Sequence, residues 1–280
     1  MRFEGFFEKR VIRMTKAAEL AGTQPGGVLS KHAETGLVFF LAHFEPQITY
    51  ARKLPRVVEA VQKELKAPHW QSSAERYIIR ETQKKFFYHF DHQLFGCQTL
   101  GVDPWLSHFP KHMEMLGTAF NRMEVPRLRA ISLRFVLQLP LGMSHPEMCE
   151  ILLDSYFADR AALELVHGKL DDALVQIEGV HKEIRSSTVI VPQTAKQSQD
   201  SFLKNANLEL FVEPKYIDPC IREFHERISV ESLQLTIELT KADVPTSDLS
   251  RVLETGIQWA ERIADGTVRR FAGLHARTEE

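Results

Sequence analysis

The chain has 280 residues, of which 44% are hydrophobic and 26% are charged. This balance is typical of a folded globular protein with ample apolar material for a core, organised as one large domain or two of common size. No uncharged apolar run approaches the roughly 18 residues that a membrane-spanning helix needs. The N-terminal stretch MRFEGFFEKRVIRM is interrupted too often by charge for a secretory leader. We therefore expect a cytoplasmic protein that does not enter a membrane.

The net charge of −2 conceals an uneven distribution along the chain. Residues 1–140 hold 20 Lys and Arg against 13 Asp and Glu, a balance of +7. Residues 141–280 hold 15 against 24, a balance of −9. Such a split predicts an anion-binding first half, two halves that attract each other, or simply an uneven surface of salt bridges.

Three cysteines, Cys97, Cys149 and Cys220, lie far apart in the sequence. They form no CxxC motif, and we recognise no Cys/His ligand spacing, so we predict neither a disulfide framework nor a structural zinc site. Free buried thiols are the expected state of these side chains. We accordingly expect no metal and no cofactor.

The first half of the chain alternates between strand and helix patterns. Apolar runs and helical periodicity predict these elements by residue number: a strand over 37–48, a helix opened by Pro55 and closed by Pro68, a three-stranded meander over 76–101, a helix from Asp103 to Phe120 with a kink at Pro110, a strand over 127–140 and a short helix from Pro146.

The strand over 127–140 carries an arginine in its middle. Its apolar face holds Ile131, Leu133 and Phe135, while Arg134 alternates onto the opposite face, so the guanidinium need not enter the core. We expect Arg134 to meet either a carboxylate from a neighbouring strand or an anion from outside, and we favour the carboxylate.

The second half predicts further strands over 173–184, 187–193 and 206–214, with a polar loop over 194–205. The stretch 232–240 alternates cleanly between apolar and polar residues, which predicts a half-buried strand. A turn with a cap at Thr246 or Ser247 then leads into a long amphipathic helix from Leu249 to Phe271.

These elements predict an α+β fold made of two helix-flanked, mainly antiparallel sheet halves packed as one unit. We divide the chain into an N-terminal helix/loop segment over 1–36, a basic half over 37–160 and an acidic, β-rich half over 161–280 that ends in the long helix. We see no internal repeat.

Several dispersed stretches resemble one sporadically distributed family of uncharacterised prokaryotic proteins of about this length. The stretches are FFYHFDHQLFGCQTLG, DPWLSHFPKHMEMLGTAF, RLRAISLRF, SLQLTIEL and the final helix. The family has Tyr and Asn where this chain has Phe135 and Leu137, so it assigns no polar role to those two positions here. The resemblance implies an α+β architecture and a cellular setting often linked to mobile elements, and it implies no known chemistry.

A set of arginines in the basic half supports the leading functional hypothesis. Planar guanidinium groups bind phosphate or carboxylate in a bidentate manner, so arginines gathered on one side of a sheet would bind anions. The candidates are Arg76, Arg80, Arg127, Arg129 and Arg134. We therefore hypothesise a non-catalytic interaction module that engages nucleic acid or a partner protein, and we leave room for a homo-oligomer.

A metal-dependent nuclease or phosphodiesterase is the first alternative. Glu213 and Lys215 end an apolar stretch in the order that such enzymes use, and Asp172 (or Asp171) would supply a further carboxylate for the metal ion. Pro214 between them would disturb an inner strand.

A DNA-binding regulator is the second alternative, because residues 15–32 have the spacing of a helix-turn-helix, although Gly26 and Gly27 weaken its second helix.

Two histidine-rich groups also offer ligand-type side chains, at His89, Asp91 and His92 and at His108 and His112. Strand alternation points His92 away from the other two, and we expect structural roles for all five residues.

Overall fold

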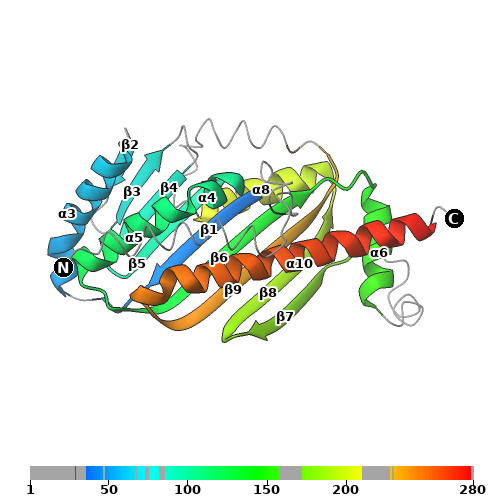
Figure 1. Cartoon of the computed structure of the whole chain (residues 1–280). Coiled ribbons are helices and arrows are strands. Elements are labelled where there is room, and N and C mark those ends of the chain that lie inside the picture. The colour runs from blue at the N-terminus through cyan, green and yellow to red at the C-terminus, as the bar shows by residue number, and fades with distance from the viewer. Residues whose placement is uncertain are drawn as a thin grey trace.

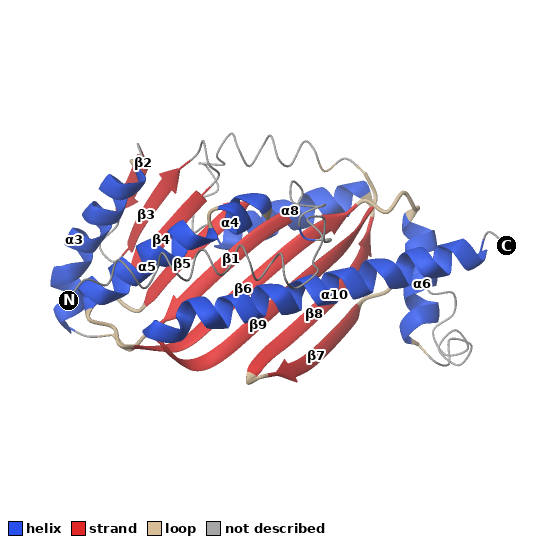
Figure 2. Cartoon of the chain, viewed as in Figure 1, coloured by secondary structure: helices blue, strands red, loops and turns tan. Residues whose placement is uncertain are grey.

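The structure is a computed structural model of the chain, and it describes residues 36–46, 48–66, 69–72, 76–81, 86–157, 172–209 and 230–278, together with Leu29 and Ile228. Its centre is one nine-stranded antiparallel sheet with the strand order β2-β3-β4-β5-β1-β6-β9-β8-β7 (Figures 1 and 2). The α+β prediction is therefore confirmed.

The strands that make up this sheet are β1 (Gly36–His43), β2 (His69–Ser72), β3 (Arg76–Glu81), β4 (Phe86–Asp91), β5 (Leu94–Leu100), β6 (Arg127–Leu139), β7 (Val175–His181), β8 (Ile184–Gln193) and β9 (Ser232–Pro245).

The helices of the described part are α3 (Ile48–Leu65), α4 (Asp103–Ser107), α5 (Phe109–Met123), α6 (His145–Tyr156), α8 (Ala195–Glu209) and α10 (Leu249–Thr278), and a 3-10 turn, η3 (Thr246–Asp248), precedes α10. Among these described helices, none combines the length and the apolar character that spanning a membrane requires.

The pairing of β6 with β9 joins the two halves of the chain at the middle of the sheet. These two long strands run antiparallel, with Phe135 opposite Ile237 and Arg134 opposite Glu238. Because side chains alternate between the faces of a strand, Phe135 and Arg134 point to opposite sides of the sheet. One face is therefore apolar and the other polar at this central seam.

Helices cover the apolar face and complete the core. Figure 1 shows α5 and the long α10 crossing in front of the sheet. Trp105, Phe135 and Phe271 are fully buried members of this core. Burial of a side chain of this size stabilises the fold by about 1.5–3 kcal/mol, so the apolar faces of β6, β9 and α10 account for much of the driving force for folding.

Helix α8 packs on the opposite, polar face through a network of hydrogen bonds. Gln138 of β6 donates to the Gln234 side chain (3.1 Å) and accepts from Ser232 (2.9 Å). Ser198 and Ser201 of α8 bond to Ser232 (2.8 Å) and Gln234 (2.5 Å) respectively. The polar side chains of β6 and β9 are therefore buried with partners, as buried polar groups must be.

Three predictions made from the sequence, of a loop, a strand and the start of a helix, need correction. The polar loop expected over 194–205 is the N-cap and most of α8, whose Ser198 and Ser201 side chains bind polar groups of β9 instead of solvent. Residues 206–209, expected in a strand, belong to α8 as well. Helix α3 starts at Ile48 and contains Pro55 in its interior, so Pro55 does not open it.

Other boundaries also differ from expectation. The helix expected from Asp103 is two helices separated at His108, because Pro110 sits in the first turn of α5. The sheet gains β2, which the sequence did not predict, and the long helix continues to Thr278. Apart from Leu29 and Gly36, the segment 1–36 lies outside the described residues, and so does the rest of the strand expected over 206–214.

Candidate metal centre

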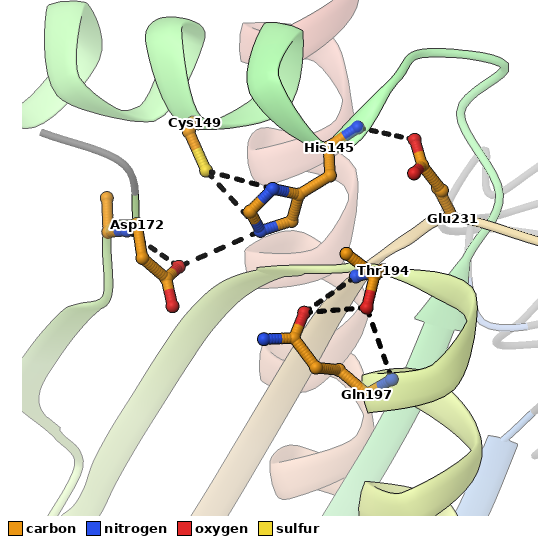
Figure 3. A network of polar contacts seen from close by, with 7 residues as sticks. His145, Cys149, Asp172, Thr194, Gln197 and Glu231 are labelled. Atoms are coloured by element: carbon orange, nitrogen blue, oxygen red, sulfur yellow. Dashed lines mark hydrogen bonds and ion pairs between the residues drawn. The ribbon is translucent and has the colours of Figure 1, made fainter.

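Three metal-ligating side chains converge at one end of the sheet. The Sγ atom of Cys149 lies 3.7 Å from Nε2 and 3.9 Å from Nδ1 of His145, and Oδ1 of Asp172 lies 3.8 Å from the same Nε2. The three ligand atoms all lie within 4.8 Å of one another. Figure 3 shows His145 and Cys149 side by side on α6, with Asp172 facing them from the segment before β7.

The N-terminus of α6 fixes the position of His145. Ser144 caps the helix: its hydroxyl accepts from the Glu147 backbone N–H, and the Glu147 carboxylate accepts from the Ser144 N–H at 2.7 Å. The backbone N–H of His145 donates to Oε2 of Glu231 at 2.5 Å. Such a reciprocal cap satisfies N–H groups that have no partner within the helix, so the first turn is held rigidly.

A second capped helix borders the same region. Thr194 caps α8 by accepting from the Gln197 backbone N–H, while the Gln197 side-chain carbonyl accepts from the Thr194 N–H at 2.8 Å. Figure 3 draws this pair in the same view as His145. Two of the three ligands, His145 and Cys149, sit on the capped helix α6, which favours a preformed geometry, while Asp172 comes from the irregular segment before β7.

The burial of the three ligands is graded. Cys149 is 3% exposed, and the side chains of His145 and Asp172 are 13% and 60% exposed. Cys149 and His145 therefore form the inner wall, while Asp172 faces solvent. An ion could reach these atoms from the side of Asp172.

The spacing of the ligand atoms suits a tetrahedral ion. Zinc bonds of about 2.3 Å to sulfur and about 2.0–2.2 Å to nitrogen and oxygen imply ligand separations of about 3.4–3.6 Å at tetrahedral angles. The two His145 contacts of 3.7 and 3.8 Å are slightly wider than this. The third separation, between the Cys149 thiol and the Asp172 carboxylate, is within 4.8 Å, so the ligands must draw closer together when an ion binds.

The same geometry does not suit a thiol nucleophile with a His–Asp relay. In such a relay the carboxylate binds one imidazole nitrogen while the other nitrogen activates the nucleophile. Here the Asp172 carboxylate meets Nε2 of His145, while the Cys149 thiol lies almost equally far from Nε2 (3.7 Å) and Nδ1 (3.9 Å). The thiol is therefore not directed at Nδ1 alone, as such a relay requires.

The protonation of Cys149 supports this conclusion. Burial raises the pKa of the Cys149 thiol to about 11, and the nearby carboxylates of Asp172 and Glu150 act in the same direction. Cys149 also sits in the second turn of α6, beyond the N-terminal residues whose dipole would stabilise a thiolate. Without a cation, this thiol is neutral near pH 7, whereas a bound dication would stabilise its thiolate.

Of the three residues of this centre, only Asp172 was predicted from the sequence as a metal ligand, and there together with Glu213 and Lys215, which lie outside the described residues. His145 and Cys149 were not predicted, although they stand four residues apart at the start of a predicted helix. On a helix, residues four apart lie on one face. This His–Cys spacing was therefore the feature of the sequence that could have indicated a metal site.

The five arginines proposed to bind anions do not converge on one spot. Arg127 pairs with Asp243 on the exposed surface, and Arg129 lies 3.9 Å from Glu45. Arg134 is half-buried and donates to Asn205 of α8 at 3.0 Å. The carboxylate directly across the strand pair from Arg134 is that of Glu238.

Arg76, Arg80 and Arg134 do share the polar face of the sheet. A row of directly opposed residues runs across five strands on this face, through Arg80, Phe87, Gln98, Phe39 and Arg134. Four strand spacings separate Arg80 from Arg134, which amounts to about 19 Å. The guanidinium of Arg134 also lies 5.8 Å from the centre of the Phe39 ring, a cation–π contact.

The two histidine-rich groups have local partners. His89 Nε2 lies 3.2 Å from Asp91 Oδ2, while His92 is exposed in the turn that follows. His112 is buried against the core, with Nδ1 2.7 Å from the Tyr88 hydroxyl, and its ring stacks on Trp105. His108 contacts the Ser107 hydroxyl at 2.9 Å.

The helix-turn-helix expected over residues 15–32 falls outside the described residues, apart from Leu29. A scan against protein-family models found no match, and neither did a search of the curated proteins. Functional inference for this chain therefore rests on the geometry of its own residues.

Proposed function

We propose that the protein binds one transition-metal ion, of the class represented by Zn²⁺, through His145, Cys149 and Asp172. The observation that carries this proposal is the approach of a thiol, an imidazole nitrogen and a carboxylate oxygen to within 4.8 Å of one another. Thiolate and imidazole ligands favour zinc and related ions over Mg²⁺ or Ca²⁺, which prefer oxygen ligands.

The number of ligands suggests what kind of centre this is. Structural zinc sites are closed by four protein ligands, whereas sites that bind or activate a small molecule keep a position for water. Three ligands are provided by the described residues, and Asp172 leaves the site open to solvent. The described residues therefore leave the fourth position of the ion to water or to a further ligand.

The direct test is titration of the metal-free full-length protein with Zn²⁺ by calorimetry and with Co²⁺ by absorption spectroscopy. We expect one ion per chain and, with Co²⁺, a thiolate charge-transfer band in the near ultraviolet. Cys149→Ser should abolish that band, and His145→Ala should weaken affinity by more than tenfold. His92→Asn, at an exposed position in the turn between β4 and β5, is the matched control and should bind as wild type. A band that survives Cys149→Ser would overturn the proposal.

An interaction module that binds nucleic acid through the basic half is the second candidate function. The placement of Arg76 and Arg80 on one face of β3 supports it, whereas Arg134 on the same sheet face is bound to Asn205 of α8. Affinity for DNA or RNA should then fall linearly with the logarithm of salt concentration, with a slope of about −0.9 per phosphate contacted on duplex DNA.

Fluorescence anisotropy with single-stranded DNA, duplex DNA and RNA at low salt would measure this binding. Arg76→Ala should reduce the salt slope by about one unit, while Arg269→Ala on α10, an exposed arginine of the acidic half, should leave it unchanged. Absence of binding to all three probes at low salt would remove the nucleic-acid hypothesis.

A further inference from the structure

Strand β7 forms one edge of the sheet and exposes apolar side chains on both of its faces. In the strand order of the described residues it stands outermost beyond β8, and Figure 1 shows it at the margin of the sheet. Ile177 and Val180 are 43% and 71% exposed, and Leu174, just before the strand, is 56% exposed. Edge strands usually carry Lys, Pro or bulges that prevent pairing with another chain, and the VQIEGVH sequence of β7 has neither Lys nor Pro.

The exposed apolar residues of this edge are symmetric about Ile177. Leu174 and Val180 each lie three residues from it. When two identical strands pair antiparallel about a two-fold axis through Ile177, Ile177 meets itself and Leu174 meets Val180 of the second copy in both directions. Gln176 then lies opposite Glu178, a pair that can hydrogen-bond. This pairing would cover all three apolar side chains, and no like charges would meet between residues 174 and 180.

The backbone of β7 also suits this pairing. A two-residue turn at Lys182 and Glu183, both with positive φ (48° and 65°), joins β7 to β8, and His181 pairs with Ile184 next to the turn. In such a hairpin the closing pair is hydrogen-bonded, so alternate residues of β7 direct their N–H and C=O groups away from β8. Those residues are Val180, Glu178, Gln176 and Leu174, which are the ones the two-fold register pairs with one another.

Two other positions of the two-fold axis would pair the residues of β7 less favourably. An axis through Glu178 would place the two Glu178 carboxylates opposite each other, and directly opposed like charges destabilise a strand pair. An axis through Val180 would leave Leu174 and Gln176 unpaired, because the second copy turns away at Lys182. Compared with these two registers, charge and length both favour the axis at Ile177.

From this symmetry we infer that β7 is a self-association surface, on which a second copy of the chain docks antiparallel with Ile177 at the two-fold axis. The sheets of the two copies join into one continuous sheet. An antiparallel edge is self-complementary, which is what a two-fold interface requires. The inference is independent of the proposed metal centre, since none of the paired side chains belongs to it.

Sedimentation velocity of the full-length protein across a wide concentration range tests the inference. We expect a monomer–dimer equilibrium that Ile177→Lys and Val180→Lys shift strongly to monomer. Both side chains are already exposed, so these changes should leave the monomer folded, which circular dichroism would verify. Val230→Lys, at another exposed apolar position (52%) outside the strand, is the control and should dimerise as wild type. A monomer at all concentrations, or a dimer unaffected by both lysines, would overturn the inference.

The register has its own test. Residues at a non-hydrogen-bonded pair have Cα atoms about 4.5 Å apart, which lies within the range that a disulfide spans. Ile177→Cys should therefore form a symmetric intermolecular disulfide on mild oxidation, identified by mass spectrometry of the linked peptide. Val180→Cys should not link to its own copy. Gln176→Lys should tighten the dimer several-fold and Gln176→Glu weaken it by a similar factor, because residue 176 lies opposite Glu178. If Val180→Cys links to itself and Ile177→Cys does not, this register is wrong.

Discussion

Oδ1 of Asp172 lies 3.8 Å from Nε2 of His145, although the two residues come from different elements, the lead-in to β7 and the first turn of α6. Cys149 approaches the same nitrogen from the next turn of α6. A metal ion at this point would connect the two elements. Ligation should therefore stabilise the fold as well as create a binding site, because an ion that binds only the folded state shifts the folding equilibrium.

Zn²⁺ should raise the melting temperature of the wild-type protein. At a free ion concentration of 100 times the dissociation constant, the stabilisation is about 2.7 kcal/mol, or about 5–10 °C for a chain of this size. Differential scanning fluorimetry with Zn²⁺ and with a chelator would measure the shift. Asp172→Asn should melt as wild type in chelator, because its side chain is 60% exposed, but should gain less from Zn²⁺. An equal gain in Asp172→Asn would exclude Asp172 as a ligand.

Ser144→Ala should destabilise the protein through loss of the α6 cap. The Ser144 hydroxyl and the Glu147 carboxylate form a reciprocal capping box, and removal of an N-cap side chain costs about 0.5–2 kcal/mol. The free energy of unfolding from urea titration would measure this cost. Ser144→Asp should retain most of the stability, because Asp is also a good N-cap. Equal losses in both variants would show that the cap is not the cause.

Gln138→Ala should lower the free energy of unfolding by more than the loss of a few apolar contacts would. Gln138 is 2% exposed and bonds to Gln234 and Ser232 in the network under α8. Its loss would leave buried polar groups with fewer partners, at a cost of about 1–3 kcal/mol. Equilibrium urea denaturation would measure the difference, and Gln258→Ala, at an exposed position of α10, is the control that should change stability little. A change near zero for Gln138→Ala would mean that water replaces the lost contacts.

Asp91 should contribute to stability only above acid pH. Burial opposes ionisation of this carboxyl, but hydrogen bonds from His89 and from the backbone N–H groups of Gln93 and Leu94 outweigh it and lower its pKa below 3.8. A folded pKa below the unfolded value gives stability that is present above about pH 4 and is lost as pH falls through the folded pKa. Asp91→Asn should therefore be less stable than wild type at pH 6, with the gap closing as the pH falls below the folded-state pKa of Asp91. Melting curves across this range would show it, with exposed Asp200→Asn as the control, and a gap independent of pH would contradict the assignment.

Much of the fold followed from local patterns in the sequence. Strict alternation in 127–139 and 232–240 predicted strands with one apolar face, and β6 and β9 have this property at the centre of the sheet. Helical periodicity after Leu249 predicted α10 in the same way. The prediction failed for α8, because Ser198, Ser201 and Asn205, which are typical of a solvated loop, are the partners of polar groups on β9 and β6.

The sequence by itself determined which residues form most of the strands and helices, and where most of these elements begin. It also determined that Arg134 points away from the apolar face of its strand. These properties depend on neighbours within a few residues. Only the tertiary structure decided that Asp172 meets His145 and Cys149, that β7 is an edge, and that Arg80 and Arg134 lie four strands apart. These relationships depend on strand order and on the docking of α6 against the end of the sheet. Contacts between residues far apart in the chain set both, and no local pattern encodes them.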